Sequence, residues 1–348
     1  MTRRAVLAVP FALIAGAAIA RLAVGPGWGL LPLMVVGPAL AAALGGLAYT
    51  LTAGAAAGTA SVLSGVNLAH TTPNEHEVVV ALLATVGVTA FGMLAARSRE
   101  RRGRELAEVK VVAEVAQRVL LRPVPPRVDS VRMADRYLSA SHGAQVGGDL
   151  YDVAPDPDRI RLIIGDAEGK GLPAVRSAAG VTGVFREAAH EEASLAAIVA
   201  RIEASLAREL GAEEFVTAIV GEIIAGEDKI ELISCGHPAP LLLGTGPPRF
   251  ADPGPSGLPL GLSDLAVTVR TPFTIGFGPG DEVLFYTDGV SEARNKAGAF
   301  FPLARCASVA AGHDPSTLVD RLSDEITRYV GHAPEDDMAL LLVYKDAA

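Results

Sequence analysis

DLYDVAPDPDRIRLIIGDAEGKG, residues 149–171, is the stretch that decides the fold of the C-terminal part of this chain. Two apolar runs flank the turn sequence PDPD, and Asp149 and Asp166 stand at the outer ends of these runs. This arrangement is typical of a β-hairpin. A hairpin folded about PDPD sets Asp149 opposite Ile164, so Asp166 becomes its diagonal neighbour on the same face, with Cα atoms ~7–8 Å apart. Two carboxylates at this separation can converge on a shared cation.

The end of this stretch, GDAEGKG at residues 165–171, has two interpretations. Small residues around a lysine suggest a loop that cradles phosphate, whereas an acid after an apolar run suggests a cation site. A phosphate loop needs four residues between its first glycine and a Gly-Lys pair, followed by Ser or Thr. Here three residues separate Gly165 from Gly169, and Gly171 follows Lys170. These details exclude a P-loop ATPase and favour the cation site.

An apolar excess marks the first hundred residues. The chain has 348 residues, 50% of them hydrophobic, and a mean hydropathy of +0.35, which is too apolar for an ordinary soluble domain. Several stretches approach the ~20 residues that a helix needs to cross ~30 Å of hydrocarbon. They are residues 5–24, 29–49, 51–69 and 78–97. We therefore expect a transmembrane domain of four helices over residues 1–97, in contact with membrane lipid.

Arginines predict the orientation of these helices. Arg3 and Arg4 precede the first span and five arginines lie within residues 97–104, whereas the loop at residues 70–77 carries only acids and histidines. Positive charge stays on the cytoplasmic side. We expect a multi-pass protein of the cell membrane with both ends, and the C-terminal domain, in the cytoplasm. An alternative interprets the first span as a signal peptide, which would leave three spans and the same cytoplasmic domain.

Charge and cysteine content exclude other classes of partner and site. The net charge of −9 leaves no basic face for phosphate backbones, so we expect no nucleic-acid partner. Cys235 and Cys306 are far apart and lack partners at metal-ligand spacing. This argues against a disulfide framework and against a thiolate zinc site.

A helical connector is predicted at residues 98–127. Apolar residues recur at largely three- and four-residue intervals within residues 100–122, as on a single-faced helix, and PVPP at residues 123–126 ends the pattern. Two interpretations stay open. The helix either packs on its own domain or pairs with a second copy to form a homodimer, and three apolar turns do not decide between them.

Strand and helix patterns alternate beyond the connector. Two consecutive helix patterns interrupt the strands, which does not fit a repeating βαβ unit, so we expect an α+β domain built on antiparallel sheets. The strand patterns lie within residues 145–154, 158–166, 215–225, 229–235, 240–244, 281–289 and 337–344, and the helix patterns within residues 172–190, 194–210 and 315–330.

Aspartates stand at the ends of four predicted strands. Asp288 closes one run and Asp336 and Asp337 open another, so these acids share an edge if the two strands are antiparallel neighbours. Carboxylates gathered at one edge repel one another and are costly to desolvate without a cation. Oxygen ligands without Cys or His select magnesium or manganese rather than zinc.

Six motifs between residues 128 and 345 carry a family resemblance. They are VGGDLYD, GDAEGKGLPA, SCGHPAPLLL, GLPLGL, FYTDGVSEARN and EDDMALLLV. In this order and spacing they resemble the PPM-type metal-dependent serine/threonine phosphatases, in the bacterial branch that acts on sigma-factor regulators and sporulation proteins. The resemblance implies an antiparallel β-sandwich flanked by helices, which we expect over residues 128–348.

The same resemblance implies roles for individual residues. Asp166 would bridge two divalent cations, Mn²⁺ or Mg²⁺, and the backbone carbonyl of Ala167 would ligate one of them. Asp149, Asp288 and Asp336 would complete the coordination, directly or through water. Asp337 competes with Asp336, but the Asp-x-Met pattern of the family favours Asp336.

Two further residues have weaker signals. His237, in the Gly-His-Pro motif, is a candidate acid catalyst, although such a motif more often forms a tight strand connection. Lys170 at a predicted helix start could contact substrate phosphate, although a solvated lysine is the default.

The predicted function is that of a membrane-anchored protein serine/threonine phosphatase, a hydrolase that uses metal-activated water on a phosphorylated cytoplasmic regulatory protein. The resemblance suggests an anti-sigma-factor antagonist as that protein. The alternative is a catalytically inactive membrane receptor that uses a phosphatase-like domain as a scaffold.

Overall fold

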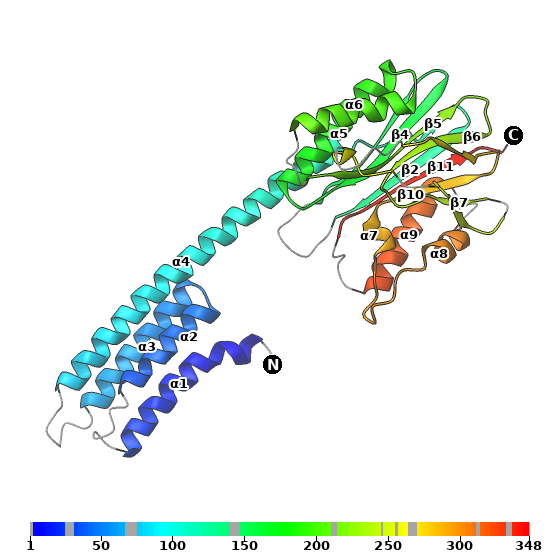
Figure 1. Cartoon of the computed structure of the whole chain (residues 1–348). Coiled ribbons are helices and arrows are strands. Elements are labelled where there is room, and N and C mark those ends of the chain that lie inside the picture. Colours follow the sequence, from blue (N-terminus) through cyan, green and yellow to red (C-terminus); the bar gives the residue numbers. More distant parts are fainter. Residues whose placement is uncertain are drawn as a thin grey trace. The chain divides into compact units, whose positions relative to one another are not determined.

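The computed structural model describes residues 3–24, 31–66, 75–139, 147–209, 214–244, 246–254, 257–263, 270–310, 314–331 and 336–347. The chain divides into two compact units, Met1–Glu108 and Val109–Ala348 (Figure 1). Each unit is described by itself below.

The N-terminal unit is helical. It contains α1 (Arg3–Val24), the 3₁₀-helix η2 (Leu31–Val35), α2 (Val36–Leu44), α3 (Leu47–Val66) and the first part of α4 (Glu75–Leu120). Two segments among the described residues are long and apolar enough to cross a membrane, Val6–Ala23 and Val78–Glu105.

The other two predicted spans have a different character. The span predicted at residues 29–49 is not one continuous α-helix. It contains the 3₁₀-helix η2 and the short helix α2, which meet at Val36. The span predicted at residues 51–69 overlaps α3, which is rich in alanine and glycine. Residues 29–30 and 67–69 and most of the predicted outer loop lie outside the described residues. The count of four spans and the domain boundaries stay predictions.

One long helix, α4, runs from the last predicted span into the predicted helical connector. α4 continues through 46 residues and ends at Leu120, shortly before the proline-rich segment expected to end it. Val115 is 57% exposed. Pairing of this helix with a second copy stays a prediction.

Two antiparallel sheets form the C-terminal unit. Their strand orders are β1-β2-β11-β10-β7-β8 and β3-β4-β5-β6-β9. The predicted strand patterns correspond to β3 (Asp149–Pro155), β4 (Arg159–Ala167), β5 (Val216–Ile224), β6 (Lys229–Cys235), β7 (Leu241–Leu243), β10 (Glu282–Tyr286) and β11 (Met338–Lys345). The predicted helices correspond to α5 (Leu172–Glu191), α6 (Leu195–Glu209) and α9 (Pro315–Val330).

Six elements of the described part of this unit were not predicted. They are β1 (Arg127–Val128), β2 (Val131–Leu138), β8 (Arg249–Phe250), β9 (Phe273–Gly276), α7 (Asp288–Ser291) and α8 (Leu303–Ala310). The most important is β2, which pairs with β11 along its whole length from Val131 to Leu138. Its arginines interrupt the apolar pattern, so its tertiary partner rather than its own sequence defines it as a strand.

Three apolar layers hold the domain together. One lies between the sheets, a second packs under α5 and α6, and a third packs under α8 and α9. Along β4, Leu162 and Ile164 belong to the layer between the sheets while Ile163 belongs to the layer under the helices, as strand alternation requires. Figure 1 shows α5 and α6 on one side of the sandwich and α7, α8 and α9 on the other. The expected antiparallel sandwich flanked by helices is confirmed.

The hairpin of β3 and β4 differs from its predicted register. Asp149 pairs directly with Asp166, whereas the sequence suggested Ile164 as its partner. The difference arises because Asp156 donates its N–H to the carbonyl of Arg159, which places Pro157 and Asp158 at the tip of the turn. The two aspartates are therefore closer than predicted, since directly opposed residues have Cβ atoms only ~4.5–5.5 Å apart.

A buried arginine, Arg161, joins this sheet to the end of α5. Arg161 on β4 is 1% exposed and donates to Glu222 on β5 at 2.7 Å. The same guanidinium donates to the carbonyls of Ala189 and Glu192, at 2.8 and 2.7 Å. Glu222 balances the charge of Arg161 in the core, and the two carbonyls at the end of α5 gain a donor.

We expect Arg161→Met to destabilise the domain by up to about 3–5 kcal/mol, because it leaves the buried Glu222 carboxylate with only the longer ion pair to Arg159, at 3.5 Å. The double variant Arg161→Met/Glu222→Leu should regain most of this stability. Scanning calorimetry of the full chain in detergent measures both. Arg201→Met is the control, since Arg201 forms its ion pairs at the surface, and it should cost less than about 1 kcal/mol. Equal losses in the single and double variants would contradict the expectation.

Candidate metal centre

Asp149 lies where the two sheets meet. Its side chain is buried, and its Oδ2 accepts a hydrogen bond from the Thr287 hydroxyl at 2.9 Å. The backbone N–H of Ala339 on β11 donates to the same hydroxyl at 2.9 Å. Thr287 thus connects the first residue of β3 in one sheet to β10 and β11 in the other. Its role was not predicted, because the sequence shows only that it precedes Asp288.

Asp166 and Asp288 complete a group of interacting carboxylates. Burial, followed by the charges of Asp166 and Asp337, raises the pKa of Asp149 well above its usual value. Burial, followed by the charges of Asp288 and Asp336, raises the pKa of Asp166 to about 7. The pKa of Asp288 is also raised, by burial and by Asp336. The structure therefore brings Asp149, Asp166, Asp288 and Asp336 to one edge of the sandwich.

The antiparallel pairing of β10 with β11 explains this meeting. Tyr286 at the end of β10 lies opposite Leu340 near the start of β11, so Asp288 and Asp336 fall at the same edge as expected. Asp288 begins the short helix α7. A Cβ atom at Gly289 would lie 2.0 Å from the carbonyl oxygen of Asp337, so only glycine allows the close packing of α7 against β11 here.

Asp336 and Asp337 have different surroundings. The Asp336 side chain is 51% exposed and forms an ion pair with Lys170 at 3.0 Å. The Asp337 side chain is buried and accepts a hydrogen bond from the backbone N–H of Gly147. Burial, with the charges of Asp337 and Asp149, raises the pKa of Tyr137 on β2, which keeps its hydroxyl protonated. Asp337 is thus turned toward the protein, and Asp336 toward the open side of the edge.

The carbonyl of Ala167 lies against Gly148. A Cβ atom at position 148 would come 2.3 Å from this oxygen, and Ala167 donates its N–H to the Gly148 carbonyl at 3.1 Å. The glycine therefore keeps space beside the Ala167 oxygen. Gly169 and Gly171 in the following turn have φ of 93° and 82°, which side chains rarely adopt.

His237 lies behind the site, next to Thr217, which is the β5 partner of Asp166. It is 7% exposed, and its Nδ1 lies 3.0 Å from the Thr217 hydroxyl. Burial lowers its pKa to about 3. The imidazole is therefore neutral near pH 7 and not the imidazolium that general acid catalysis needs, in agreement with the structural role expected for the Gly-His-Pro motif.

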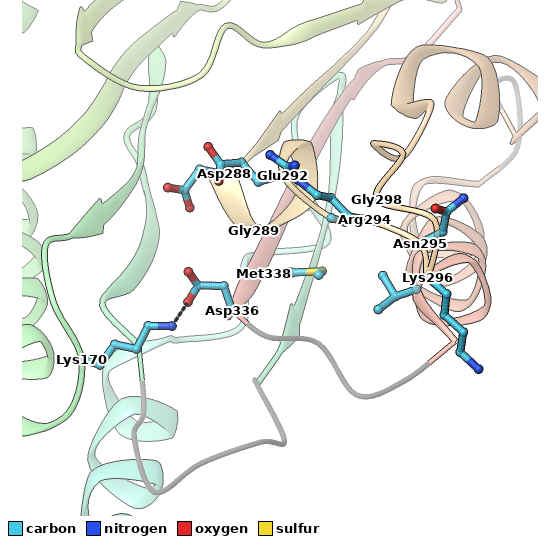
Figure 2. Close-up of a pocket in the computed structure, with 12 residues that line it drawn as sticks. Lys170, Asp288, Gly289, Glu292, Arg294, Asn295, Lys296, Gly298, Asp336 and Met338 are labelled. Carbon is cyan, nitrogen blue, oxygen red and sulfur yellow. Dashed lines mark ion pairs between the residues drawn. The ribbon is translucent and has the colours of Figure 1, made fainter.

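A cavity of about 670 Å³ opens beside the carboxylates (Figure 2). Its wall includes Lys170, Asp288, Asp336 and Met338, residues 292–296, and Gly298. Within the ranges described above, no three His, Cys, Asp or Glu side chains are close enough to one point to hold an ion together as they stand. The edge is thus a set of mutually repelling carboxylates beside a cavity, and their assignment as ligands stays a prediction.

The fold has counterparts in known proteins. A family model described as Stage II sporulation protein E (SpoIIE) matches residues 156–346. The chain belongs to this family. Phosphoserine phosphatase RsbU from Bacillus subtilis (strain 168) is 21% identical over 240 residues, which cover 68% of this chain and 70% of that protein.

Two solved structures share the fold. The RsbU and RsbW domains of a Mycobacterium tuberculosis protein are 26% identical, with a TM-score of 0.53 over 65% of this chain and 62% of that chain. The PP2C phosphatase domain of SpoIIE from Bacillus subtilis, with a fragment of its regulatory domain, is 17% identical, with a TM-score of 0.55 over 64% of this chain and 66% of that chain. This chain thus spans less than two thirds of each. The resemblance to the sporulation and stress branch of PPM-type phosphatases is confirmed.

The raised pKa of Asp166 predicts the pH dependence of the metal-free protein. Its folded-state pKa of about 7 exceeds the ordinary 3.8, so the folded state binds more protons and stability falls as pH rises from about 4 through 7. Asp166→Asn removes this charge and should stabilise the metal-free protein at pH 8 by on the order of 2–4 kcal/mol.

Calorimetry of the full chain with EDTA at pH 5 and pH 8 measures this effect. The gain should be smaller at pH 5, where Asp166 is largely protonated in the folded wild type. An Asp166→Asn variant that is less stable than wild type at pH 8 would contradict the electrostatic interpretation. Asp158→Asn serves as the control, because Asp158 is exposed and beside Arg159.

Proposed function

We propose that this chain is a membrane-anchored, metal-dependent phosphatase that acts on phosphoserine or phosphothreonine of a cytoplasmic regulatory protein. The observation that carries the proposal is the gathering of Asp149, Asp166, Asp288 and Asp336 at one sandwich edge beside a cavity of about 670 Å³. Membership of the SpoIIE family supports it, as does the relative RsbU, which is named a phosphoserine phosphatase.

The residues at this edge fit two divalent cations, Mn²⁺ or Mg²⁺. Carboxylate and carbonyl oxygens are the ligands that these ions prefer, and the raised pKa of Asp149 and of Asp166 marks negative charge in need of compensation. We assign the ions to Asp149, Asp166, the carbonyl of Ala167, Asp288 and Asp336. When bound, they would supply Lewis-acid activation of the attacking water and offset charge on the phosphoryl group.

The chain's own side chains position this centre. Thr287 fixes the orientation of Asp149 through its hydroxyl, and Asp337 anchors the Gly147 backbone that leads into β3. Lys170 lies on the wall of the cavity and brings a positive charge next to Asp336. We propose that Lys170 also contacts the phosphate oxygens of the substrate.

The anchor and the substrate are parts of the same proposal. The segments Val6–Ala23 and Val78–Glu105 support insertion in the membrane, and the arginines at residues 97–104 support a cytoplasmic position for the C-terminal unit. The similarity to the branch that acts on sigma-factor regulators supports a phosphorylated anti-sigma-factor antagonist as substrate.

The full chain in detergent should hydrolyse p-nitrophenyl phosphate only when Mn²⁺ or Mg²⁺ is present, and EDTA should abolish the activity. Asp288→Asn should lower kcat by more than ~10–100-fold, which is the usual loss when a residue that only orients a metal ligand is replaced. Metal-independent hydrolysis would contradict the mechanism.

Asp336→Asn and Asp337→Asn form a matched pair within this experiment. If Asp336 is the ligand, its variant should lose Mn²⁺ affinity in titration calorimetry, while Asp337→Asn should mainly lower stability. A folded wild-type chain that takes up no Mn²⁺ would instead favour the inactive scaffold.

Reporter fusions test the orientation. A reporter after residue 73 should lie outside the cell and one after residue 105 in the cytoplasm, because the arginines at residues 97–104 resist translocation. An external signal at residue 105 would contradict both the span count and the access of the domain to cytoplasmic phosphoproteins.

A further inference from the structure

Four residues of the segment Arg294–Phe300, here called the basic turn, contribute to the wall of the cavity: Arg294, Asn295, Lys296 and Gly298. Figure 2 shows Asn295 and Lys296 on one side of the cavity and Lys170, Asp288 and Asp336 on the other. Glu292 belongs to the acidic side, because its charge acts on Asp288. The cavity therefore has an acidic end, where we place the metals, and a basic end.

The basic turn is held in one shape by its own hydrogen bonds. The Oδ1 of Asn295 accepts from the backbone N–H groups of Ala297 and Ala299, both at 3.0 Å. Gly298 has a φ of 81° and donates its N–H to the Asn295 carbonyl at 2.8 Å. The hydroxyl of Tyr329 on α9 donates to the Phe300 carbonyl at 2.9 Å. The turn is thus pre-organised, which lowers the entropy that a ligand would have to offset.

Arg294 and Lys296 give this turn its charge. The Arg294 guanidinium lies over the ring of Phe300, 4.1 Å from its centroid. Both side chains are exposed. In the part of the chain that the structure describes, neither forms an ion pair. Lys170, by contrast, is paired with Asp336.

We propose that the basic turn binds an acidic side chain of the substrate protein, next to the residue whose phosphate enters the acidic end. This inference rests on the proposed function and names the class of substrate, a phosphoserine segment with acidic flanking residues. The cavity of about 670 Å³ has the size of a small-molecule binding site. It can therefore hold the phosphorylated side chain together with a flanking side chain of the substrate. The chain has a net charge of −9, yet Arg294 and Lys296 place positive charge beside the proposed phosphate site. This charge favours an acidic residue next to the phosphoserine of the substrate.

Two matched peptides test this assignment on the full chain in detergent with Mn²⁺. They share one phosphoserine sequence and carry either glutamates or glutamines on both sides of it. The ratio of kcat/KM for the acidic peptide to that for the neutral peptide should be about 3–10 in the wild type. Lys296→Glu should bring the ratio below one, and 0.3 M salt should reduce the wild-type ratio because the ion pair is screened.

Lys229→Glu is the matched control, because it makes the same charge change on an exposed lysine at the start of β6 outside the cavity wall. It should keep the wild-type ratio. A wild-type ratio near one, or a ratio that Lys296→Glu and Lys229→Glu change equally, would overturn the assignment.

A binding measurement tests the basic turn independently of the proposed phosphatase activity. The same two peptides with a non-hydrolysable phosphonate in place of the phosphate can be followed by fluorescence anisotropy. If the phosphoserine peptides are not hydrolysed but Lys296→Glu still removes a preference for the acidic phosphonate peptide, the phosphatase function fails and the basic turn stands. If hydrolysis occurs without any preference for acidic flanks in either assay, the function stands and the basic turn does not.

Discussion

Like charges buried at the edge of a β-sandwich are the constraint on which the rest of this domain depends. Asp149 and Asp166 are directly opposed across β3 and β4, and Asp288 and Asp336 approach them from the other sheet. Such a group destabilises the fold unless each carboxylate is held and compensated. The protein holds Asp149 with Thr287 and turns Asp337 toward the Gly147 backbone. Asp288 and Asp336 line the cavity, where cations would offset their charge.

The two sheets matter because neither could assemble this edge alone. β3 and β4 supply Asp149 and Asp166, while β10 and β11 supply the positions before Asp288 and after Asp336. The apolar layer between the sheets brings these four strand ends within reach of one another. The outer layers under α5 and α6 and under α8 and α9 bury the opposite faces. Burial of these outer faces stabilises the sandwich, and this stability offsets the repulsion among the carboxylates.

The local sequence predicted the helices and strands that have a strong apolar periodicity. It did not predict the features that depend on a partner distant in the sequence. The runs of β4 and β11 and the helix α9 follow from their own periodicity. The register of β3 against β4 did not, because the hydrogen bond from Asp156 to Arg159 selects one of several turns that PDPD allows. β2 exists through its pairing with β11. The aspartates of the site were recognisable as acids at strand ends, whereas Thr287 acts only across the sheets, and no spacing in the sequence reveals that.

The end of α5 depends on a residue far away in the sequence, so the evolutionary constraint on this helix end falls on that residue. No glycine follows this helix, and Glu192 after it has an extended backbone. The carbonyls of Ala189 and Glu192 are instead satisfied by Arg161, a residue of the sheet 28 and 31 positions earlier. Substitution in the short link after α5 should thus be tolerated among homologues, because its backbone contribution survives any change of side chain. Position 161 has no such freedom. Replacement of Arg161 would remove the donor to the carbonyls at the end of α5, although the two sites are far apart in the sequence.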